Sequence, residues 1–552
     1  MHFVPGAAGL LSPPLPTRKN LTVTLTFGYL LDSLPATHNL IRVLRAFTFA
    51  VREDGGCQRT MRINWHKTSH GQSSRSRRLS WFFGNLAPIL TLAIALTACG
   101  GVTKSSPSAP GTPSDPGISL DPGTTSTPGT PAPPPGPDLS AAFFGMHMHT
   151  GVLGQQPWPT DSFGGLRLWN TGTAWSEINT RDRTYNWSVF DEWLTAADAH
   201  GVSNLLYTFG RTPTWASSNP GDTTCAYTNG NGSGQCWPPN DLNSDGTGSN
   251  QHWKDFVTAL VAHNASKSGS RVKYWEIWNE FDQPITWKGS NAQLARLAQD
   301  ARTIILAADP AALVLTPSSS TGLTATASQM KAYLATPGAS NAADAIAIHP
   351  YVQQSGILPI PEDVVTLIGN VKNILSGPDA AKPLWSTEGS WGVTKQTGFT
   401  DPDQQAAFTA RYLVLQQSAG ITSLYWYEWN NTIDGTLWYP TGTHNCTTSA
   451  GCITRAGVAY QQIYVWTVGA MLASPCSATG TIWKCQLTRA NGYLGEVVWD
   501  TSQTCQDGLC TTSQFALDSQ FVHSRDLTGV VTNVSGSPTV AIGAKPILLE
   551  NQ

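Results

Sequence analysis

Eight short apolar runs, separated by longer amphipathic stretches, constrain the fold of this chain more than any other feature. They occupy 143–147, 165–169, 203–208, 272–278, 313–316, 345–349, 383–386 and 422–427. Helical periodicity fills the intervals, most clearly at 188–200, 252–264 and 291–308. Eight such units over about 310 residues predict an α/β fold of the (β/α)8 TIM-barrel type. A doubly wound open sheet is the competing interpretation, but no glycine-rich nucleotide loop follows the first run.

The C-terminal part has a different pattern. One more helical stretch covers 456–473, and the segments beyond it read as β-strands broken by turns. We therefore predict a TIM-barrel domain over 141–473 and a small β-sandwich-like accessory domain over 474–552.

The segment 79–98 is uncharged and follows Arg75, Arg77 and Arg78. A basic flank followed by an apolar run with small residues near its end is typical of a secretory signal. A transmembrane helix is the alternative, because 20 residues could span a bilayer. The sequence 96–100, LTACG, resembles a bacterial lipoprotein box, which favours the signal and implies that Cys99 is lipid-modified.

The remaining N-terminal residues fall into three parts. Residues 1–60 show no sustained period, and we expect a doubtful extension whose true start lies at or near Met61. Residues 61–98 are then the lipoprotein signal, and 99–140, rich in Pro, Gly, Ser and Thr, form a mobile linker. The predicted location is the cell envelope or surface of a bacterium, with a lipid anchor in the membrane.

Ten cysteines are present. Besides Cys57 and Cys99, eight fall into four close pairs: Cys225/Cys236, Cys446/Cys452, Cys476/Cys485 and Cys505/Cys510. An even set of local pairs in an exported protein predicts four short-loop disulfides. A zinc site is less consistent with the sequence, since no pair has two-residue spacing and no suitable His pattern lies nearby.

Charge and composition limit the classes of function that this chain can have. From residue 99 onward the chain carries 22 basic and 33 acidic residues, a net charge of −11. This balance argues against nucleic acid as a partner, because phosphate contacts need clustered Lys and Arg. Only 12% of residues are charged, whereas Trp numbers 21 and Gly 51, a composition suited to a secreted, sugar-handling protein.

Two of the predicted strands end in carboxylates. The fourth reads KYWEIWNE and ends in Asn279-Glu280, and the seventh reads KPLWSTE and ends in Glu388. Catalytic groups of this fold lie at the carboxyl ends of strands. Two carboxylates facing each other there fit retaining glycoside hydrolysis, in which one protonates the leaving oxygen and the other attacks the anomeric carbon. Either Glu alone would more simply be a surface residue.

The arrangement resembles clan A of the glycoside hydrolases over about residues 143–455. The resemblance implies that Glu280 is the general acid/base, Glu388 the nucleophile, and Asn279 a hydrogen-bond partner of the sugar 2-hydroxyl. Arg167 matches the Arg that keeps the nucleophile ionised, although it could be a structural ion-pair partner. The motif His349-Pro350-Tyr351 resembles the clan's His-x-Tyr, whose Tyr supports the nucleophile and whose His lines the site; a buried structural His is the alternative.

Further substrate-binding candidates lie near the predicted mouth. Trp429 could form the aromatic floor under the reacting sugar, with Trp426 competing for that role. His147 and His149 alternate on the first strand, so they face the same way; they could contact substrate, and for a metal role the sequence offers no third ligand. Glu428 is a further acidic residue there. Several loop tryptophans could stack on sugars or pack onto the barrel, among them Trp158, Trp175, Trp215, Trp237, Trp287, Trp391 and Trp438.

No cofactor is expected, and no metal. The segment Asp241–Gly246 imitates the start of a calcium loop, but its twelfth position is His252 rather than the bidentate Glu. A turn-rich loop is the better interpretation.

Within the clan, the segment 166–202 is most similar to glycoside hydrolase family 39 and its relatives. The chain departs from that family at the fourth strand, where Asn-Glu-Pro is replaced by Asn279-Glu280-Phe281. We therefore predict a retaining glycosidase acting on β-linked polysaccharide or oligosaccharide, with endo action favoured. The alternatives are an exo-acting β-xylosidase-like hydrolase and a catalytically silent carbohydrate-binding lipoprotein.

Overall fold

The computed structural model describes residues 139–552 except 155, 227–231, 432 and 507, and the backbone of three strands nearer the N-terminus. These strands, β1 (Thr22–Thr26), β2 (Ala46–Arg52) and β3 (Gln58–Asn64), pair antiparallel in that order. They belong to one compact unit, 1–124, and the rest of the chain to a second, 125–552. The predicted signal core, Cys99 and most of the linker lie outside the described residues, and the start near Met61 stays a prediction.

The eight predicted strands form one parallel sheet that closes into a barrel. They are β4 (Phe144–His147), β5 (Gly165–Leu168), β6 (Asn204–Thr208), β7 (Val272–Glu276), β8 (Leu313–Leu315), β9 (Ile346–Ile348), β10 (Leu384–Gly389) and β11 (Ile421–Trp426). Their order is β8-β7-β6-β5-β4-β11-β10-β9. The parallel bridges Leu315–Ala345 and Ser319–Ile348 join the two ends of the sheet. The predicted TIM-barrel fold is confirmed.

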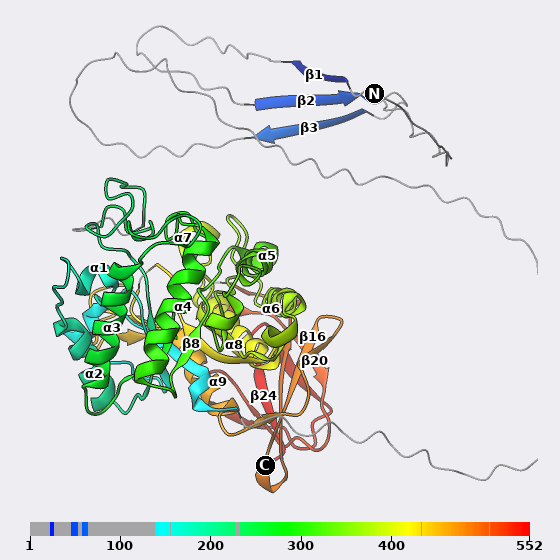
Figure 1. The fold of residues 1–552 in the computed structure, drawn as a ribbon. Helices are drawn as coiled ribbons and strands as arrows, with labels where there is room; N and C mark the ends of the chain where they lie inside the picture. The colour runs from blue at the N-terminus through cyan, green and yellow to red at the C-terminus, as the bar shows by residue number, and fades with distance from the viewer. Residues whose placement is uncertain are drawn as a thin grey trace, which may run out of the picture. The chain divides into compact units, whose positions relative to one another are not determined.

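Helices surround this barrel (Figure 1). The longer ones are α2 (Ser188–Ala199), α3 (Gln251–Ala265), α4 (Asn291–Ala308), α5 (Gly322–Leu334), α6 (Asp363–Ile374), α8 (Pro402–Ser418) and α9 (Arg455–Thr467). Short helices are α1 (Trp175–Ile178), α7 (Thr394–Thr397) and the 3-10 turns η1 (Ala141–Phe143), η2 (Thr150–Leu153), η3 (Ser340–Ala342), η4 (Gly377–Ala381) and η5 (Ala490–Gly492). The helices predicted at 188–200, 252–264 and 291–308 are confirmed to within one residue at each end.

Local chemistry accounts for where several helices begin and end. Ser290 and Gln293 form a capping box at the start of α4, and Asp401 caps α8 ahead of Pro402. The helix predicted over 456–473 is wrong at its C-terminus. It stops at Thr467 because Val468 is extended and Gly469 has a φ of +74°, and the chain then enters β14 (Met471–Leu472).

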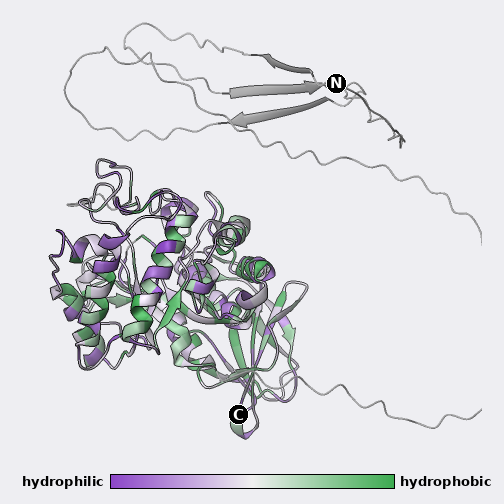
Figure 2. Cartoon of the chain, viewed as in Figure 1, coloured by the Kyte–Doolittle hydropathy of each residue, from purple (hydrophilic) through white to green (hydrophobic). Residues whose placement is uncertain are grey.

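The barrel interior is built in two layers. The lower layer is apolar and contains Leu206, Leu315, Ala345, Ala347, Trp385 and Tyr425. Tyr425 fits because β4 carries Gly145 beside it, where a Cβ would lie 2.4 Å from the ring. Two residues further along their strands, and therefore on the same face, Thr208, Glu276 and Thr387 form a polar layer toward the mouth. Figure 2 shows the predominantly apolar strands enclosed by helices of mixed hydropathy.

The C-terminal region is rich in strands, as predicted. Its main sheet has the order β14-β16-β17-β24-β21-β22, with β15 also paired to β16, and β20 pairs with β23. The strands are β15 (Ser477–Thr479), β16 (Ile482–Arg489), β17 (Tyr493–Asp500), β18 (Cys505–Gln506), β19 (Leu509–Cys510), β20 (Thr512–Ala516), β21 (His523–Arg525), β22 (Val531–Asn533), β23 (Thr539–Gly543) and β24 (Ile547–Glu550). A hairpin of β12 (Trp438–Tyr439) and β13 (Cys452–Ile453) precedes α9.

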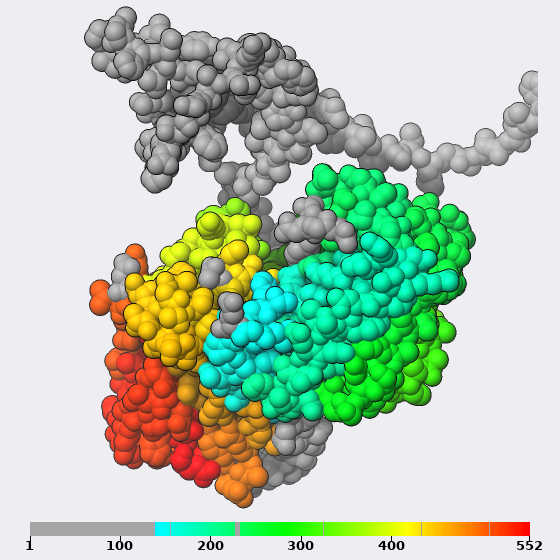
Figure 3. Space-filling model, turned by 90° about the vertical axis from the view of Figure 1, so that its left-hand side faces the viewer, coloured from blue at the N-terminus to red at the C-terminus, as the bar shows by residue number. Residues whose placement is uncertain are grey.

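This region packs directly on the barrel. Gln404 of α8 donates to the Cys505 carbonyl at 2.6 Å, and Lys545 lies 3.0 Å from the Asp403 carboxylate. Trp499 donates to Glu362 at 2.8 Å. The orange and red C-terminal part accordingly lies against the yellow part of the barrel in Figure 3. The β-rich segment thus shares a continuous hydrophobic core with the barrel.

All four predicted disulfides are present: Cys225–Cys236, Cys446–Cys452, Cys476–Cys485 and Cys505–Cys510. Each closes a short loop, so the pairing predicted from spacing is confirmed. Within the described residues, no helix combines the length and apolarity needed to cross a bilayer.

Candidate active site

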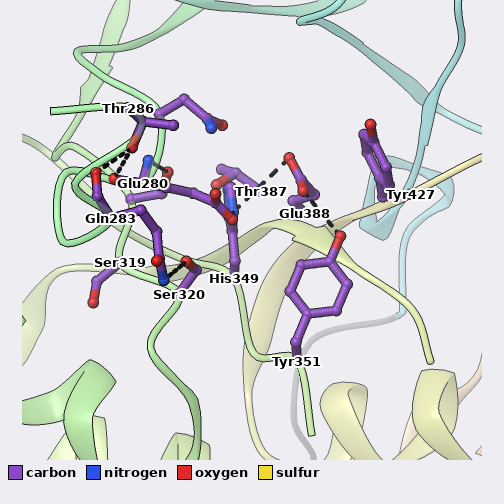
Figure 4. Close-up of polar contacts among 12 residues, drawn as sticks. Glu280, Gln283, Thr286, Ser319, Ser320, His349, Tyr351, Thr387, Glu388 and Tyr427 are labelled. Atoms are coloured by element: carbon purple, nitrogen blue, oxygen red, sulfur yellow. Dashed lines mark hydrogen bonds and ion pairs between the residues drawn. The ribbon is translucent and has the colours of Figure 1, made fainter. Parts of the chain in front are cut away.

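The two predicted catalytic carboxylates meet at the barrel mouth. Glu388 belongs to β10, and Glu280 follows β7 by four residues. One oxygen of each carboxylate and one ring nitrogen of His349 all lie within 4.8 Å of one another. Figure 4 shows Glu280 and Glu388 on either side of the His349 imidazole. The structure therefore brings together three residues that are spread over 108 positions of the chain.

The Glu280 backbone adopts an unusual conformation. Its φ is +49°, in the left-handed region that non-glycine residues rarely occupy. The surrounding turn holds it there: the Glu280 N–H donates to the Ser318 hydroxyl at 3.1 Å, and the Glu280 carbonyl accepts from the Gln283 N–H at 3.0 Å. Such conformations persist where neighbouring structure imposes them, and they cluster at functional sites.

Arg167 links the two sides of the site from the floor of the mouth. Its Nη1 donates to Glu388 Oε2 at 2.6 Å and its Nη2 to Asn279 Oδ1 at 2.7 Å. The residue is fully buried, and burial alone would lower its pKa. The adjacent carboxylates of Glu276 and Glu388 outweigh burial and raise the pKa of Arg167, so the guanidinium stays charged. Asn279 and Arg167 thus lie at the positions that the sequence predicted.

Glu276 is a site residue that sequence analysis missed. Its Oε2 accepts from Arg167 Nε and Nη2 at 3.1 and 3.0 Å and from the Thr208 hydroxyl at 2.6 Å, while Oε1 accepts from the Thr387 hydroxyl at 2.8 Å. Burial would raise the pKa of Glu276, but Arg167 and then His349 lower it below its ordinary value. Glu276 is therefore an ionised carboxylate inside the barrel that fixes Arg167 from below.

His349 lies between Glu280 and Glu388. Its Nδ1 lies 2.9 Å from Glu280 Oε1 and 3.8 Å from Glu388 Oε2. Burial would lower the pKa of His349, but Glu388 and the hydrogen bond with Glu280 raise it. For Glu280 burial acts in the opposite sense and would raise the pKa, yet the His349 contact lowers it. One proton is therefore held between His349 and Glu280.

Tyr351 lies where the motif predicted, below Glu388 in Figure 4. Its hydroxyl donates to Glu388 Oε1 at 2.9 Å. Burial and then the Glu388 charge raise the pKa of Tyr351 well above its ordinary value, so the phenol remains a donor. Glu388 is consequently held through both oxygens, one by Tyr351 and one by Arg167.

The two histidines of the first strand do face the same way, toward Glu428. His149 Nε2 lies 2.8 Å and His147 Nε2 3.8 Å from Glu428 Oε2. His147 and Glu428 are fully buried, whereas the His149 side chain is 38% exposed. Burial lowers the pKa of His147 well below its ordinary value, so its imidazole is neutral. Burial raises the pKa of Glu428, which the contact with His149 only partly offsets.

The structure brings a third potential metal ligand, Glu428, to the two histidines. Donor atoms of His147, His149 and Glu428 lie within 4.8 Å of one another, as those of Glu280, His349 and Glu388 do. Either set could coordinate a cation, and either could equally accept and donate hydrogen bonds to a sugar. In the predicted turn-rich loop, Asp241 Oδ2 accepts from the Ser249 hydroxyl and the Gln251 N–H at 2.7 and 2.5 Å, so it is used to order the start of α3.

Burial divides the tryptophans that the sequence offered as sugar contacts, and the two favoured ones, Trp391 and Trp429, are buried. Trp391 is 1% exposed and packs against Trp426, with ring centroids 5.7 Å apart, while Trp429 is fully buried beside Trp438. Neither ring presents a face to the mouth. Of the other loop tryptophans, Trp175, Trp287 and Trp438 are also buried, whereas Trp158, Trp215 and Trp237 are partly exposed.

Tyr427 is the aromatic residue that reaches the site from the end of β11. Figure 4 places its side chain beyond Glu388, on the side away from Glu280. Its hydroxyl accepts from the Asn170 amide at 3.1 Å, and its ring lies 4.5 Å from that of His147. The sequence pattern favours Trp426 and Trp429, which flank Tyr427, because nothing in it reveals which side chains turn inward at the end of the strand.

Comparisons with known proteins agree with this architecture. No protein-family model matches the chain, and no curated protein matches it. Among solved structures, a family 39 glycoside hydrolase from Bacteroides cellulosilyticus WH2 is similar with a TM-score of 0.52 at 16% identity, over 75% of this chain and 82% of that one. A monomeric β-xylosidase from Caulobacter crescentus CB15 is similar with a TM-score of 0.51 at 16% identity, over 76% and 97%. These likenesses show that the chain has the fold of those glycoside hydrolases.

Proposed function

We propose that this protein is a retaining glycoside hydrolase that cleaves β-glycosidic bonds in a polysaccharide or oligosaccharide. The spacing of Glu280 and Glu388 carries the proposal, because carboxylate oxygens within 4.8 Å of each other match the short separation of retaining enzymes. Inverting enzymes need about 6.5–9.5 Å to admit a water molecule. The fold shared with solved glycoside hydrolases supports the same reaction class.

Glu388 acts as the nucleophile. Arg167 and Tyr351 each hold one of its oxygens, at 2.6 and 2.9 Å, so the carboxylate is fixed in position with a cation beside it. Attack on the anomeric carbon forms a covalent glycosyl ester, and the sugar–oxygen bond to the leaving group breaks. Both contacts also stabilise the carboxylate when water later hydrolyses the ester and releases it.

Glu280 acts as the acid and then as the base. In the free site His349 and Glu280 share a proton over 2.9 Å. A bound sugar excludes water, which disfavours the charged imidazolium–carboxylate pair relative to neutral imidazole and carboxylic acid. Substrate binding therefore moves the proton onto Glu280, which donates it to the leaving oxygen and later removes one from the attacking water.

Asn279 positions the sugar. Its amide oxygen accepts from Arg167, which fixes the side-chain orientation and turns the amide nitrogen into the donor for the 2-hydroxyl. This hydrogen bond strengthens as the ring approaches the oxocarbenium-like transition state. His149, whose side chain is 38% exposed, binds the far side of the same sugar, while the fully buried His147 packs behind it against Tyr427.

Endo action on a polymer is our preferred mode, with an exo-acting β-xylosidase-like activity as the alternative. The long insertion 212–251 could border an extended cleft, and its Cys225–Cys236 disulfide keeps part of it ordered. The similar structure from Caulobacter crescentus is that of a β-xylosidase, which supports the alternative.

Product analysis tests both the reaction and the mode. Purified protein is incubated with a panel of β-glucans, xylans and their oligosaccharides, alongside Glu388→Ala, Glu280→Gln and the surface control Glu192→Gln. Oligosaccharides released by the wild type and the control, but not by Glu388→Ala, support endo hydrolysis; monosaccharide alone supports exo hydrolysis. Proton NMR must show the product first in the β configuration. A first product of α configuration, or unimpaired Glu388→Ala, contradicts the mechanism.

We also propose that the protein is exported and anchored to a membrane through lipid on Cys99. The uncharged segment 79–98, the LTACG sequence and the four disulfides support this location. Metabolic labelling with an alkyne fatty acid tests it. We expect label on the wild type and none on Cys99→Ala, and equal labelling of the two would contradict the anchor.

A further inference from the structure

Three side chains of the kinds that bind metals come together on two neighbouring strands. His147 is the last residue of β4, His149 follows it on the same face, and Glu428 comes two residues after β11. The strands β4 and β11 are paired, and the Trp429 N–H donates to the His147 carbonyl at 3.0 Å. We call His147, His149 and Glu428 the histidine cluster.

Backbone contacts place the histidine cluster at the barrel mouth. The Tyr427 N–H donates at 3.1 Å to the carbonyl of Gly389, the residue after Glu388. The Tyr427 ring lies 4.5 Å from the His147 ring, and Figure 4 shows the Tyr427 side chain beside Glu388. The side chain of His149 is 38% exposed, so a small ion can reach the cluster from solvent.

The donor atoms of the cluster are not used by the protein itself. Within the part of the chain that the structure describes, both ring nitrogens of His147, His149 Nε2 and Glu428 Oε2 are buried without a hydrogen-bond partner. His149 Nε2 and Glu428 Oε2 lie 2.8 Å apart, yet they do not form a hydrogen bond. Buried polar atoms normally have a partner. The His147 side chain is fully buried, and a metal ion is small enough to bind it, whereas a sugar is not.

The spacing fits a single transition-metal ion. Zinc lies about 2.0–2.2 Å from nitrogen and oxygen ligands, so two ligands of one ion are roughly 3–4 Å apart. Glu428 Oε2 lies 2.8 Å from His149 Nε2 and 3.8 Å from His147 Nε2. Two imidazoles and one carboxylate are a known zinc ligand set that leaves a coordination position open. Calcium and magnesium prefer oxygen ligands, so neither fits this cluster.

Two neighbouring amides orient the ligands. The Asn431 side chain donates to Glu428 Oε1, which leaves Oε2 facing the histidines. The His149 N–H donates to Asn430 Oδ1 at 2.9 Å. Outer contacts of this kind fix the direction of ligands in metal sites.

The other His–carboxylate group is less suited to an ion. His349 Nδ1 lies 2.9 Å from Glu280 Oε1 in a hydrogen bond, and Arg167 and Tyr351 hold the two oxygens of Glu388 at 2.6 and 2.9 Å. An ion bound there would have to displace these contacts, and it would meet the positive charge of Arg167. The histidine cluster is therefore the better of the two sites.

We propose that the histidine cluster binds one Zn²⁺ or a similar transition-metal ion, and that the bound ion inhibits hydrolysis. The site itself does not depend on the proposed function. The inhibition rests on it, because an ion on His149 removes a proposed contact to the sugar. Glu280 and Glu388 lie outside the cluster, so the metal-free protein is the active form and the ion is not a cofactor.

Calorimetry with ZnCl₂ and the visible absorption of bound Co²⁺ test the site on tag-free protein that has been treated with EDTA and dialysed. We expect one equivalent to bind the wild type. Asn431→Ala keeps all three ligands but releases the Glu428 carboxylate, and it should weaken binding about 10–100-fold. His149→Gln removes a ligand and should weaken binding more. His200→Gln, an exposed change at the end of α2, is the matched control and should bind as the wild type does.

Hydrolysis then separates this inference from the proposed function. One equivalent of Zn²⁺ should raise KM for the wild type and His200→Gln but not for His149→Gln, and EDTA should reverse the effect. No binding by the wild type, or equal binding by His149→Gln, overturns the site. Binding that leaves a measurable hydrolysis unchanged overturns the inhibition. Binding by a protein that hydrolyses nothing when metal-free supports the site and overturns the glycosidase function.

Discussion

Replacing Glu276 by Gln tests whether a carboxylate inside the barrel controls the catalytic pair. The change removes one buried negative charge and keeps the side-chain shape. The amide oxygen can still accept from Arg167, and the amide nitrogen can point at Thr387, whose hydroxyl rotates to accept from it. The perturbation is therefore the loss of charge at the contacts to Arg167, 3.0 and 3.1 Å long.

The expected loss of unfolding free energy follows from the partners that Arg167 keeps once the Glu276 charge is removed. Removing one partner of a buried ion pair costs about 3–5 kcal/mol when the other is left alone. Arg167 keeps Glu388 at 2.6 Å and a neutral acceptor at residue 276, so we expect about 2–3 kcal/mol less free energy of unfolding. For a unit of this size the fall in Tm should be about 2–3 °C. If half of this free energy is lost from the stabilisation of the transition state, kcat should fall about tenfold.

The pH profile distinguishes charge from packing. With Glu276 neutral, Arg167 is balanced by Glu388 alone, and the acidic limb of kcat/KM should move to lower pH. The matched control is Thr208→Val, which removes the 2.6 Å hydrogen bond to Glu276 and the 3.0 Å hydrogen bond from Arg167 Nε but keeps both charges. It should cost about 1 kcal/mol and leave the acidic limb in place. A Glu276→Gln protein with wild-type Tm and an unmoved limb would refute the reasoning.

Four further outcomes are expected. Tyr351→Phe removes the 2.9 Å bond to the nucleophile and should lower kcat about 10–100-fold without lowering Tm by more than a few degrees, as measured by steady-state kinetics and calorimetry. His349→Gln should lose most stability between pH 4.5 and 6.5. Burial opposes both charges, but the pairing raises the pKa of His349 above 6.5 and lowers the pKa of Glu280 below 4.5, so the ion pair stabilises the fold fully only between these two values. Tm of the wild type and the variant measured across pH tests this, and a difference that stays constant with pH would contradict it. Gly145→Ala places a Cβ 2.4 Å from the Tyr425 ring and should cost more than ~2 kcal/mol in chemical denaturation, whereas Gly369→Ala, in open space on α6, should be neutral or stabilising. Chelation with EDTA should leave hydrolysis unchanged, and its abolition would point to a metal at one of the two His–carboxylate groups.

The parts of the site that could be predicted are those fixed by position along a strand. The apolar runs gave all eight barrel strands, and strand ends place Asn279, Glu280 and Glu388 at the mouth whatever the loops do. Arg167 and His349 were singled out by the resemblance to clan A, whose motifs place an Arg on the second strand and a His at the end of the sixth. The disulfides followed from spacing, because close cysteines in a short loop have few other partners.

The parts of the site that could not be predicted from the sequence depend on the direction in which side chains point. Glu276 lies in a strand apolar on both faces, so alternation could not separate the barrel interior from the helix-covered side. A charge inside such a run was nonetheless a signal, since buried carboxylates require a partner. Trp391, Trp429 and Tyr427 lie in segments without a period, where long-range packing alone decides which ring reaches the mouth.

The two-layered barrel interior has a consequence for how such a protein can diversify. Arg167 and its carboxylate partner Glu276 are held by strands of the barrel, whereas Asp434 and the insertion 212–251 belong to loops outside the sheet. The charge balance between Arg167 and Glu276 thus depends on the barrel strands, and the loops can change without altering it. On the proposed function, exchanging whole loops between proteins of this fold should therefore change which glycans are bound while leaving Arg167 and Glu276 in place.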